Sequence, residues 1–216
     1  MMHSESVLIG RLGLPGELTL LPSPTGLIVF VHGSGSSRTS PRNRAVAQTL
    51  HGRRFATLLF DLLTDAEAAS RENVFDIEFL AQRLGQALDW ANDVLALRAL
   101  PIGLFGASTG AAAALVVSAE RPNEVAALVS RGGRPDLAGA SLGDVRAPTL
   151  LIVGGSDAEV LQLNRAAYAR LKCEKRLEIV PRATHLFAEA GALERVAELA
   201  RDWFADHFGG AAVADA

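Results

Sequence analysis

The sequence predicts a single α/β domain in which a mostly parallel sheet is covered by helices on both faces. Two observations favour this fold class. Apolar runs at residues 26–32 and 55–60 show no alternation of polar and apolar side chains, which is typical of strands buried on both faces. These runs alternate with segments of helical periodicity. Since no linker or internal repeat divides the chain, we expect one domain over residues 1–208 and a flexible tail over residues 209–216.

The first half of the chain is expected to begin with an antiparallel edge. Two short strands, at residues 7–9 and 17–21, flank a turn at residues 13–16. Residues 62–75 are expected to form a loop rich in acidic and small residues. The other elements expected in this half are strands at residues 26–32 and 55–60 and helices at residues 42–50 and 76–97.

The second half repeats the alternation of strand and helix. A strand at residues 102–106 turns into an alanine-rich helix that begins at Ser108. The later expected elements are strands at residues 125–130, 149–153 and 177–180 and helices at residues 159–171 and 192–208. This order implies parallel strands joined by crossover helices.

Composition excludes several classes of protein. With 49% hydrophobic and 21% charged residues the chain can build a sizeable core, and a net charge of −3 argues against nucleic acid as the main partner. The single cysteine, Cys173, excludes an internal disulfide framework and a multi-cysteine zinc site, and it suits a cytoplasmic location. Neither a signal peptide nor a membrane-length apolar run is present, so we expect no membrane partner.

The segment around Ser108 carries the strongest chemical signal. Gly106, Ser108 and Gly110 have the G-x-S-x-G spacing between an apolar strand and a helix. A nucleophilic serine on such a tight turn needs small neighbours, and the start of the helix offers free N–H groups to a developing oxyanion. The alternative interpretation is an ordinary glycine-rich turn with a surface serine.

Three other loops are expected at the same edge of the sheet, where the carboxyl ends of parallel strands meet. They contain Ser34, Asp157 and His185. The order Ser108, Asp157, His185 along the chain is the order used by α/β-hydrolases.

The chain therefore resembles the α/β-hydrolase superfamily from about residue 27 to residue 208. It is most similar to the small, lidless dienelactone-hydrolase-like group, and more narrowly to bacterial hydrolase domains sometimes fused to a phosphoribosyltransferase-like domain. No phosphoribosyltransferase portion is expected within these residues. The segments that carry the resemblance are residues 32–37, 106–110, 130–136 and 184–187.

Roles for these residues follow from the chemistry of ester cleavage. Ser108 needs a base, and His185 is the natural one because an imidazole titrates near neutral pH. Asp157 would orient that imidazole, although Asp61 and Asp136 also follow strands and are rivals.

The remaining expected parts are the oxyanion donors, which would be the backbone N–H groups of Ser34 and Thr109. His32 is expected to shape the loop that carries Ser34. The other histidines, His3, His51 and His207, lie in the tail or on helices and are poorer candidates for the base.

Two features separate this chain from dienelactone hydrolases proper, which carry a cysteine nucleophile and a glutamate in the first loop. Here the nucleophile is Ser108, and residues 33–40 contain no acidic side chain, so general ester hydrolysis is expected instead.

Residues 131–148 leave no room for a lid domain, which predicts a shallow site. Arg131 or Arg134 could bind an anionic group of the substrate, or Arg131 could form a structural pair with Asp136 or loop carbonyls.

The function expected is a serine hydrolase that cleaves small soluble carboxylic esters or lactones through an acyl-enzyme. The alternatives are a thioesterase, acyltransferase or peptidase with the same triad, and a non-catalytic module that binds a small molecule. No metal or organic cofactor is expected, because the chain lacks both H-E-x-x-H and a phosphate-cradling Gly-Lys loop. A small-molecule ester is the expected partner, and a homo-oligomer is compatible with the sequence.

Overall fold

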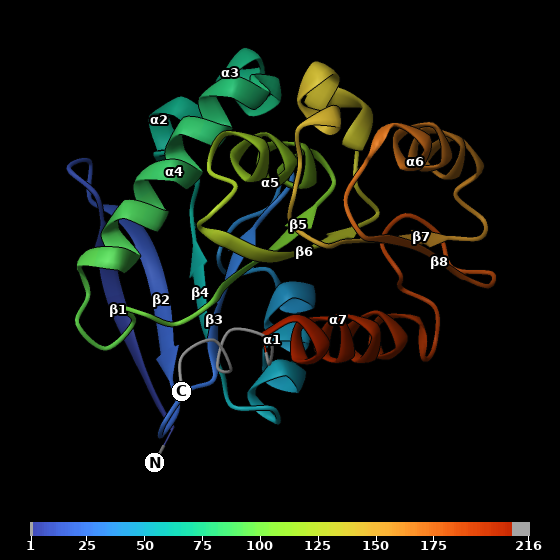
Figure 1. Cartoon of the computed structure of the whole chain (residues 1–216). Helices are drawn as coiled ribbons and strands as arrows, with labels where there is room; N and C mark the ends of the chain where they lie inside the picture. The colour runs from blue at the N-terminus through green and yellow to red at the C-terminus, as the bar shows by residue number, and fades with distance from the viewer. Residues whose placement is uncertain (1, 209–216) are drawn as a thin grey trace.

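The computed structural model describes residues 2–208 and contains one eight-stranded sheet (Figure 1). The strand order across the sheet is β1-β2-β4-β3-β5-β6-β7-β8. The strands are β1 (His3–Ile9), β2 (Leu14–Leu20), β3 (Gly26–Val31), β4 (Phe55–Phe60), β5 (Ile102–Ala107), β6 (Val125–Arg131), β7 (Thr149–Gly154) and β8 (Lys175–Val180). Strands β3 to β8 run parallel to one another, so the predicted fold class is confirmed.

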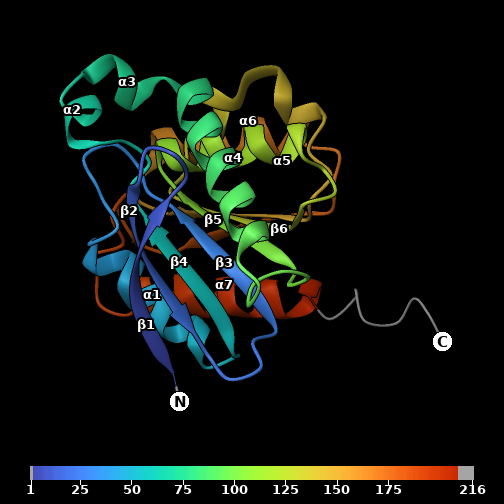
Figure 2. The same ribbon diagram turned by 90° about the vertical axis from the view of Figure 1, so that its left-hand side faces the viewer.

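Helices cover both faces of the sheet, each over its own apolar core. Figures 1 and 2 show α1 and α7 on one face and α4, α5 and α6 on the other. Fully buried phenylalanines, Phe30 and Phe105 among them, fill the core beneath α1 and α7. The other core contains the alanines of α5, whose small side chains let this helix lie close to the sheet. The five helices are α1 (Pro41–His51), α4 (Ile77–Asp93), α5 (Thr109–Glu120), α6 (Ala158–Arg170) and α7 (Ala192–Phe208).

The antiparallel edge is present, but its turn lies earlier than expected. Strand β2 pairs antiparallel with both β1 and β4. The turn occupies residues 10–13, where Gly10 and Gly13 both adopt a φ of 64° that favours glycine. Pro15 and Gly16, which suggested a turn, instead belong to β2. Pro15 is the second residue of β2 and precedes the register with β4, which begins at Gly16, so the strand tolerates a proline there.

The expected loop at residues 62–75 is wrong in detail, because it contains two short helices, α2 (Asp65–Ala68) and α3 (Arg71–Phe75). A capping box starts α2: Thr64 Oγ1 accepts the N–H of Glu67, and the Glu67 carboxylate accepts the N–H of Thr64. Glu67 also pairs with the buried Arg83 of α4, which ties this segment to the body of the domain.

Between β6 and β7 the chain forms only a short 3₁₀ segment, η1 (Pro135–Gly143), which agrees with the expected absence of an inserted lid. Helix α4 ends at Asp93, four residues earlier than its periodicity predicted. The predicted tail over residues 209–216 lies outside the described residues. Within residues 2–208, no helix has the length and apolar character needed to span a membrane.

Candidate active site

Ser108 stands on a strained turn between β5 and α5. Its φ of 50° and ψ of −123° are unfavourable for a residue with a side chain, and its Oγ makes no capping bond to the helix. A Cβ at Gly110 would collide with the carbonyl oxygens of Val31 and His32, and a Cβ at Gly106 would lie 2.5 Å from the Cα of Ala111. Both glycines are therefore required by close backbone approach, as the G-x-S-x-G spacing predicted.

His185 and Asp157 meet at the same edge of the sheet. His185 lies in the loop after β8, and its Nδ1 donates a hydrogen bond of 2.8 Å to Asp157 Oδ2 in the loop after β7. The Asp157 side chain is 15% exposed, whereas that of His185 is 40% exposed. The carboxylate is thus shielded while the imidazole remains accessible from the surface.

The two rival carboxylates are engaged elsewhere. Asp61 accepts a hydrogen bond of 2.7 Å from the backbone N–H of Arg38 and pairs with the guanidinium of the same residue. Asp136 pairs with Arg134 through two bonds of 2.9 and 2.8 Å. Asp157 is therefore the carboxylate that His185 contacts.

Ser108 and His185 line one cavity of about 260 Å³. No direct hydrogen bond joins their side chains among the described residues, which is common before substrate binds. Two arginines, Arg42 and Arg131, also line this cavity. The other lining residues are Gly33, Ser34, Ser36, Ala107 and Leu186, so the wall of this cavity contains no carboxylate.

The two residues predicted as oxyanion donors are brought together. The N–H of Ser34 donates a hydrogen bond of 3.0 Å to Thr109 Oγ1. This bond holds the loop after β3 against the first residue of α5, within reach of Ser108. The N–H of Ser34 thus has a hydroxyl acceptor in the free protein, a contact that sequence reasoning did not reveal.

His32 braces that loop in its neutral form. Its Nε2 accepts the N–H of Leu62 at 3.1 Å, so the other ring nitrogen, Nδ1, carries the proton and donates to the Gly33 carbonyl at 3.0 Å. Burial lowers the pKa of His32, against the smaller opposing effects of Gly33 and the Asp61 charge. The expectation that His32 shapes the loop is consistent with these contacts.

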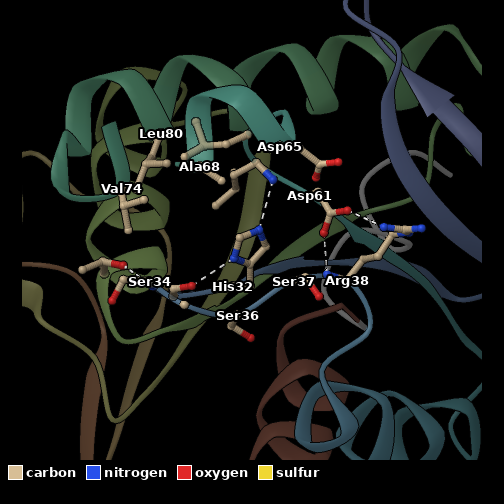
Figure 3. Close-up of a pocket in the computed structure, with 15 residues that line it drawn as sticks. His32, Ser34, Ser36, Ser37, Arg38, Asp61, Asp65, Ala68, Val74 and Leu80 are labelled. Carbon is tan, nitrogen blue, oxygen red and sulfur yellow. Dashed lines mark hydrogen bonds and ion pairs between the residues drawn. The ribbon is translucent and has the colours of Figure 1, made fainter. Parts of the chain in front are cut away.

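A second cavity, of about 310 Å³, shares Gly33, Ser34 and Ser36 with the first. Figure 3 shows Ala68, Val74 and Leu80 facing His32 and Ser34 across it. Together with Leu62 and Leu63 these side chains form an apolar wall. Leu80 of this wall belongs to α4, and the other four side chains come from residues 62–75, where the sequence predicted a loop.

The two arginines of the segment at residues 130–136 lie in different environments. Arg131 is only 7% exposed and lines the cavity of Ser108, whereas Arg134 lies outside that cavity and pairs with Asp136. Buried Asn164 of α6 donates to the Gly133 carbonyl at 3.0 Å and so fixes this loop. Sequence reasoning missed Arg42 and Asn164, since neither belongs to a recognisable motif.

No group of three His, Cys, Asp or Glu side chains within residues 2–208 is arranged to hold a metal ion. The parallel sheet, the strained serine and the hydrogen-bonded Asp157–His185 pair define the class of protein, an α/β hydrolase.

Comparisons with known proteins refine this class. A solved dienelactone hydrolase from Anabaena variabilis superposes with a TM-score of 0.91 and 51% identity, covering 96% of this chain and 98% of that one. Est1E from Butyrivibrio proteoclasticus shares the fold, with a TM-score of 0.80 and 16% identity over 95% of this chain and 99% of that one. No protein-family model matches the chain. The chain belongs to the dienelactone-hydrolase-like family of α/β hydrolases.

Curated relatives are longer than this chain. Two proteins of Mycobacterium tuberculosis, from strains CDC 1551 and H37Rv, are each 57% identical to it over 204 residues and carry the name "Putative phosphoribosyl transferase". The match covers 94% of this chain but 46% of each relative. The chain therefore spans about half the length of the curated relatives it matches.

Proposed function

We propose that the chain hydrolyses small carboxylic esters or lactones through an acyl-enzyme formed on Ser108. The observation that carries this proposal is the 2.8 Å bond from His185 to Asp157 beside the cavity that also contains the strained Ser108. A serine hydroxyl is a weak nucleophile, and an imidazole held by a carboxylate can accept its proton. The family supports hydrolysis in general, and the ester substrate is our inference from the site.

In this mechanism Ser108 Oγ attacks the carbonyl carbon and passes its proton to His185 Nε2. Asp157 accepts the Nδ1–H bond and stabilises the imidazolium that forms. His185 then donates the proton to the departing alcohol, and water attacks the acyl-enzyme by the same route in reverse.

The tetrahedral oxyanion would be bound by the backbone N–H groups of Thr109 and Ser34. Thr109 is the first residue of α5, where the N–H groups have no partner within the helix. The N–H of Ser34 bonds to Thr109 Oγ1 in the free protein, so the oxyanion would replace that hydroxyl as the acceptor. The bond to Thr109 Oγ1 therefore holds the N–H of Ser34 close to the position from which it would donate to the oxyanion, before substrate binds.

The transferase name of the curated relatives does not extend to this chain in our proposal. The matched half of those proteins corresponds to a hydrolase fold, and the other half has no counterpart here. We assign any phosphoribosyl transfer in those proteins to the half that this chain does not match.

Labelling with a fluorophosphonate probe, combined with hydrolysis of p-nitrophenyl acetate, tests the proposal. We expect one label on Ser108, and the Ser108→Ala variant should lose both the label and about 10⁴- to 10⁶-fold of the hydrolysis rate. A Ser141→Ala variant, changed in η1 outside the cavity, should behave as the wild type. An unlabelled wild-type protein that hydrolyses no ester would indicate a binding module instead.

A further inference from the structure

Arg131 is a buried cation without a carboxylate partner. It is the last residue of β6, in register with Ala107 of β5, which immediately precedes the nucleophile. The side chain is 7% exposed, and its Nε has no hydrogen-bond partner. Its guanidinium lies 6.0 Å from the centre of the Phe187 ring, the outer limit of a cation–π contact. Buried charges normally have a partner, so this arrangement calls for an explanation.

Arg42 adds a second positive charge to the same cavity. It lies in the first turn of α1, at the positive end of the helix dipole, and its buried Nε also has no hydrogen-bond partner. Among residues 2–208, no carboxylate forms an ion pair with Arg42 or Arg131, and the cavity wall that they share has none. The protein as a whole has a net charge of −3, so this positive region is local.

The positive charge of Arg42 raises the free energy of the charged Arg131 guanidinium. Burial, followed by repulsion from Arg42, lowers the pKa of Arg131 to about 10, which still leaves it charged at neutral pH. The nearby Arg134 has the usual partner of a charged guanidinium, a carboxylate, because it forms two bonds to Asp136. An anion between Arg42 and Arg131 would supply the missing partner and form bidentate hydrogen bonds.

We propose that Arg42 and Arg131 bind a phosphate group of the substrate, close to the carbonyl that Ser108 attacks. A phosphate monoester carries nearly two negative charges at neutral pH, which matches two unpaired guanidiniums better than one carboxylate does. Because a cavity of about 260 Å³ contains both arginines, Ser108 and His185, the phosphate lies only a few bonds from the scissile carbonyl. The catalytic part of this inference rests on the proposed hydrolysis, whereas the anion binding does not.

Calorimetric titration of the Ser108→Ala variant tests the anion site without catalysis. The probes are propyl phosphate, butyrate and butyramide, which have similar size and decreasing charge. We expect affinity in that order, with butyramide not bound. Adding Arg131→Gln or Arg42→Gln should weaken propyl phosphate about 30-fold each. Arg44→Gln, on the same helix but paired with Glu17 at the surface, should leave the affinity unchanged.

Competition shows whether the anion site belongs to the substrate. In the wild type, propyl phosphate should inhibit hydrolysis of p-nitrophenyl acetate competitively, with an inhibition constant that rises about 30-fold in Arg131→Gln.

Equal affinity for propyl phosphate and butyramide, or an effect of Arg44→Gln as large as that of Arg131→Gln, would overturn the anion site. Tighter binding of butyrate than of propyl phosphate would overturn the choice of phosphate, and non-competitive inhibition would overturn the substrate assignment. If no ester is hydrolysed, the proposed function fails while the titration still decides the anion site.

Discussion

The two cavities that border the loop after β3 differ in the chemistry of their walls. The cavity of about 260 Å³ contains Ser108, His185 and two arginines. The one of about 310 Å³ has an apolar wall from residues 62–80, and Arg38, Asp61 and Asp65 also line it. They share Gly33, Ser34 and Ser36 of the loop after β3. We therefore expect a substrate whose carbonyl lies at this loop to place a charged group in the first cavity and an apolar group in the second.

The two cavities therefore offer two different binding environments next to the proposed nucleophile, Ser108. Arginines in a partly enclosed cavity favour anions, because a lower local dielectric strengthens the interaction. An apolar wall favours methylene groups by about 0.8 kcal/mol each.

The largest effect is expected from Asp157→Asn. The amide would keep the size of the side chain but leave His185 in the wrong tautomer, so kcat should fall by about 10⁴-fold. The rate of p-nitrophenyl acetate hydrolysis measures this loss. Asp136→Asn, which alters only the partner of Arg134, should retain nearly full activity. If Asp61→Asn caused the large loss instead, the acid would be wrongly assigned.

Filling the apolar cavity should change the preference for acyl length. We expect wild-type activity to peak with short acyl groups, from acetate to butyrate, because the apolar wall is small. Ala68→Phe should reduce kcat/KM for p-nitrophenyl butyrate roughly tenfold relative to acetate, since two methylenes lose about 0.8 kcal/mol each. Ala69→Phe, at an exposed position outside the cavity, is the matched control. Equal losses on both esters would mean that the acyl chain lies elsewhere, and a wild-type maximum at dodecanoate would contradict the small wall.

Lower pH should destabilise the loop that borders both cavities. Burial lowers the pKa of His32, so below about pH 6.5 the unfolded chain binds a proton that the folded protein excludes. The stability due to neutral His32 is therefore complete above pH 6.5 and is lost as the pH falls, by up to about 1.4 kcal/mol per pH unit.

Melting temperatures at pH 7.5, 6.5 and 5.5 measure this effect. Burial also lowers the pKa of His51, whose ring bonds to Thr57. The variant His51→Gln therefore separates the contributions of His51 and His32 to the pH dependence of the melting temperature. The decline should persist in His51→Gln. A melting temperature that stays level or rises over this range would contradict the neutral state of His32.

Much of this molecule could be predicted because its interior strands carry an unambiguous signal. Apolar runs located β3, β4, β5 and β7 correctly, and the strand ends then indicated which loops hold Ser108, Asp157 and His185. Proline and glycine misled at residues 13–16, because Pro15 and Gly16 lie at the start of β2, where the pairing with β4 has not begun or only begins. Helix α2 was missed because a capping box and a tertiary ion pair to Arg83 stabilise it, rather than any apolar periodicity.

Other parts of the site depend on contacts between distant segments. Arg42 looked like one more polar residue at a helix start, and only the folded chain places it beside Arg131. The bond from Ser34 to Thr109 likewise joins loops that no local pattern relates. The strand end at Arg131 favoured this residue as the anion-binding arginine, with Arg134 as the alternative, and a structural pair of Arg131 with Asp136 was also open. In the structure Asp136 pairs with Arg134 instead.

The smallest expected effect is a difference in melting temperature between variants of Arg131 and of Arg134. Arg131→Met should raise the melting temperature by about 2–4 °C, because an apolar side chain in that buried place costs less than an unpaired charge. Arg134→Met should lower it by about 1–3 °C, because it breaks a partly exposed pair with Asp136. Added propyl phosphate should stabilise the wild type and Arg134→Met but not Arg131→Met. If Arg131→Met instead lost stability like Arg134→Met and responded to phosphate like the wild type, the Arg131 guanidinium would brace its loop and not bind substrate.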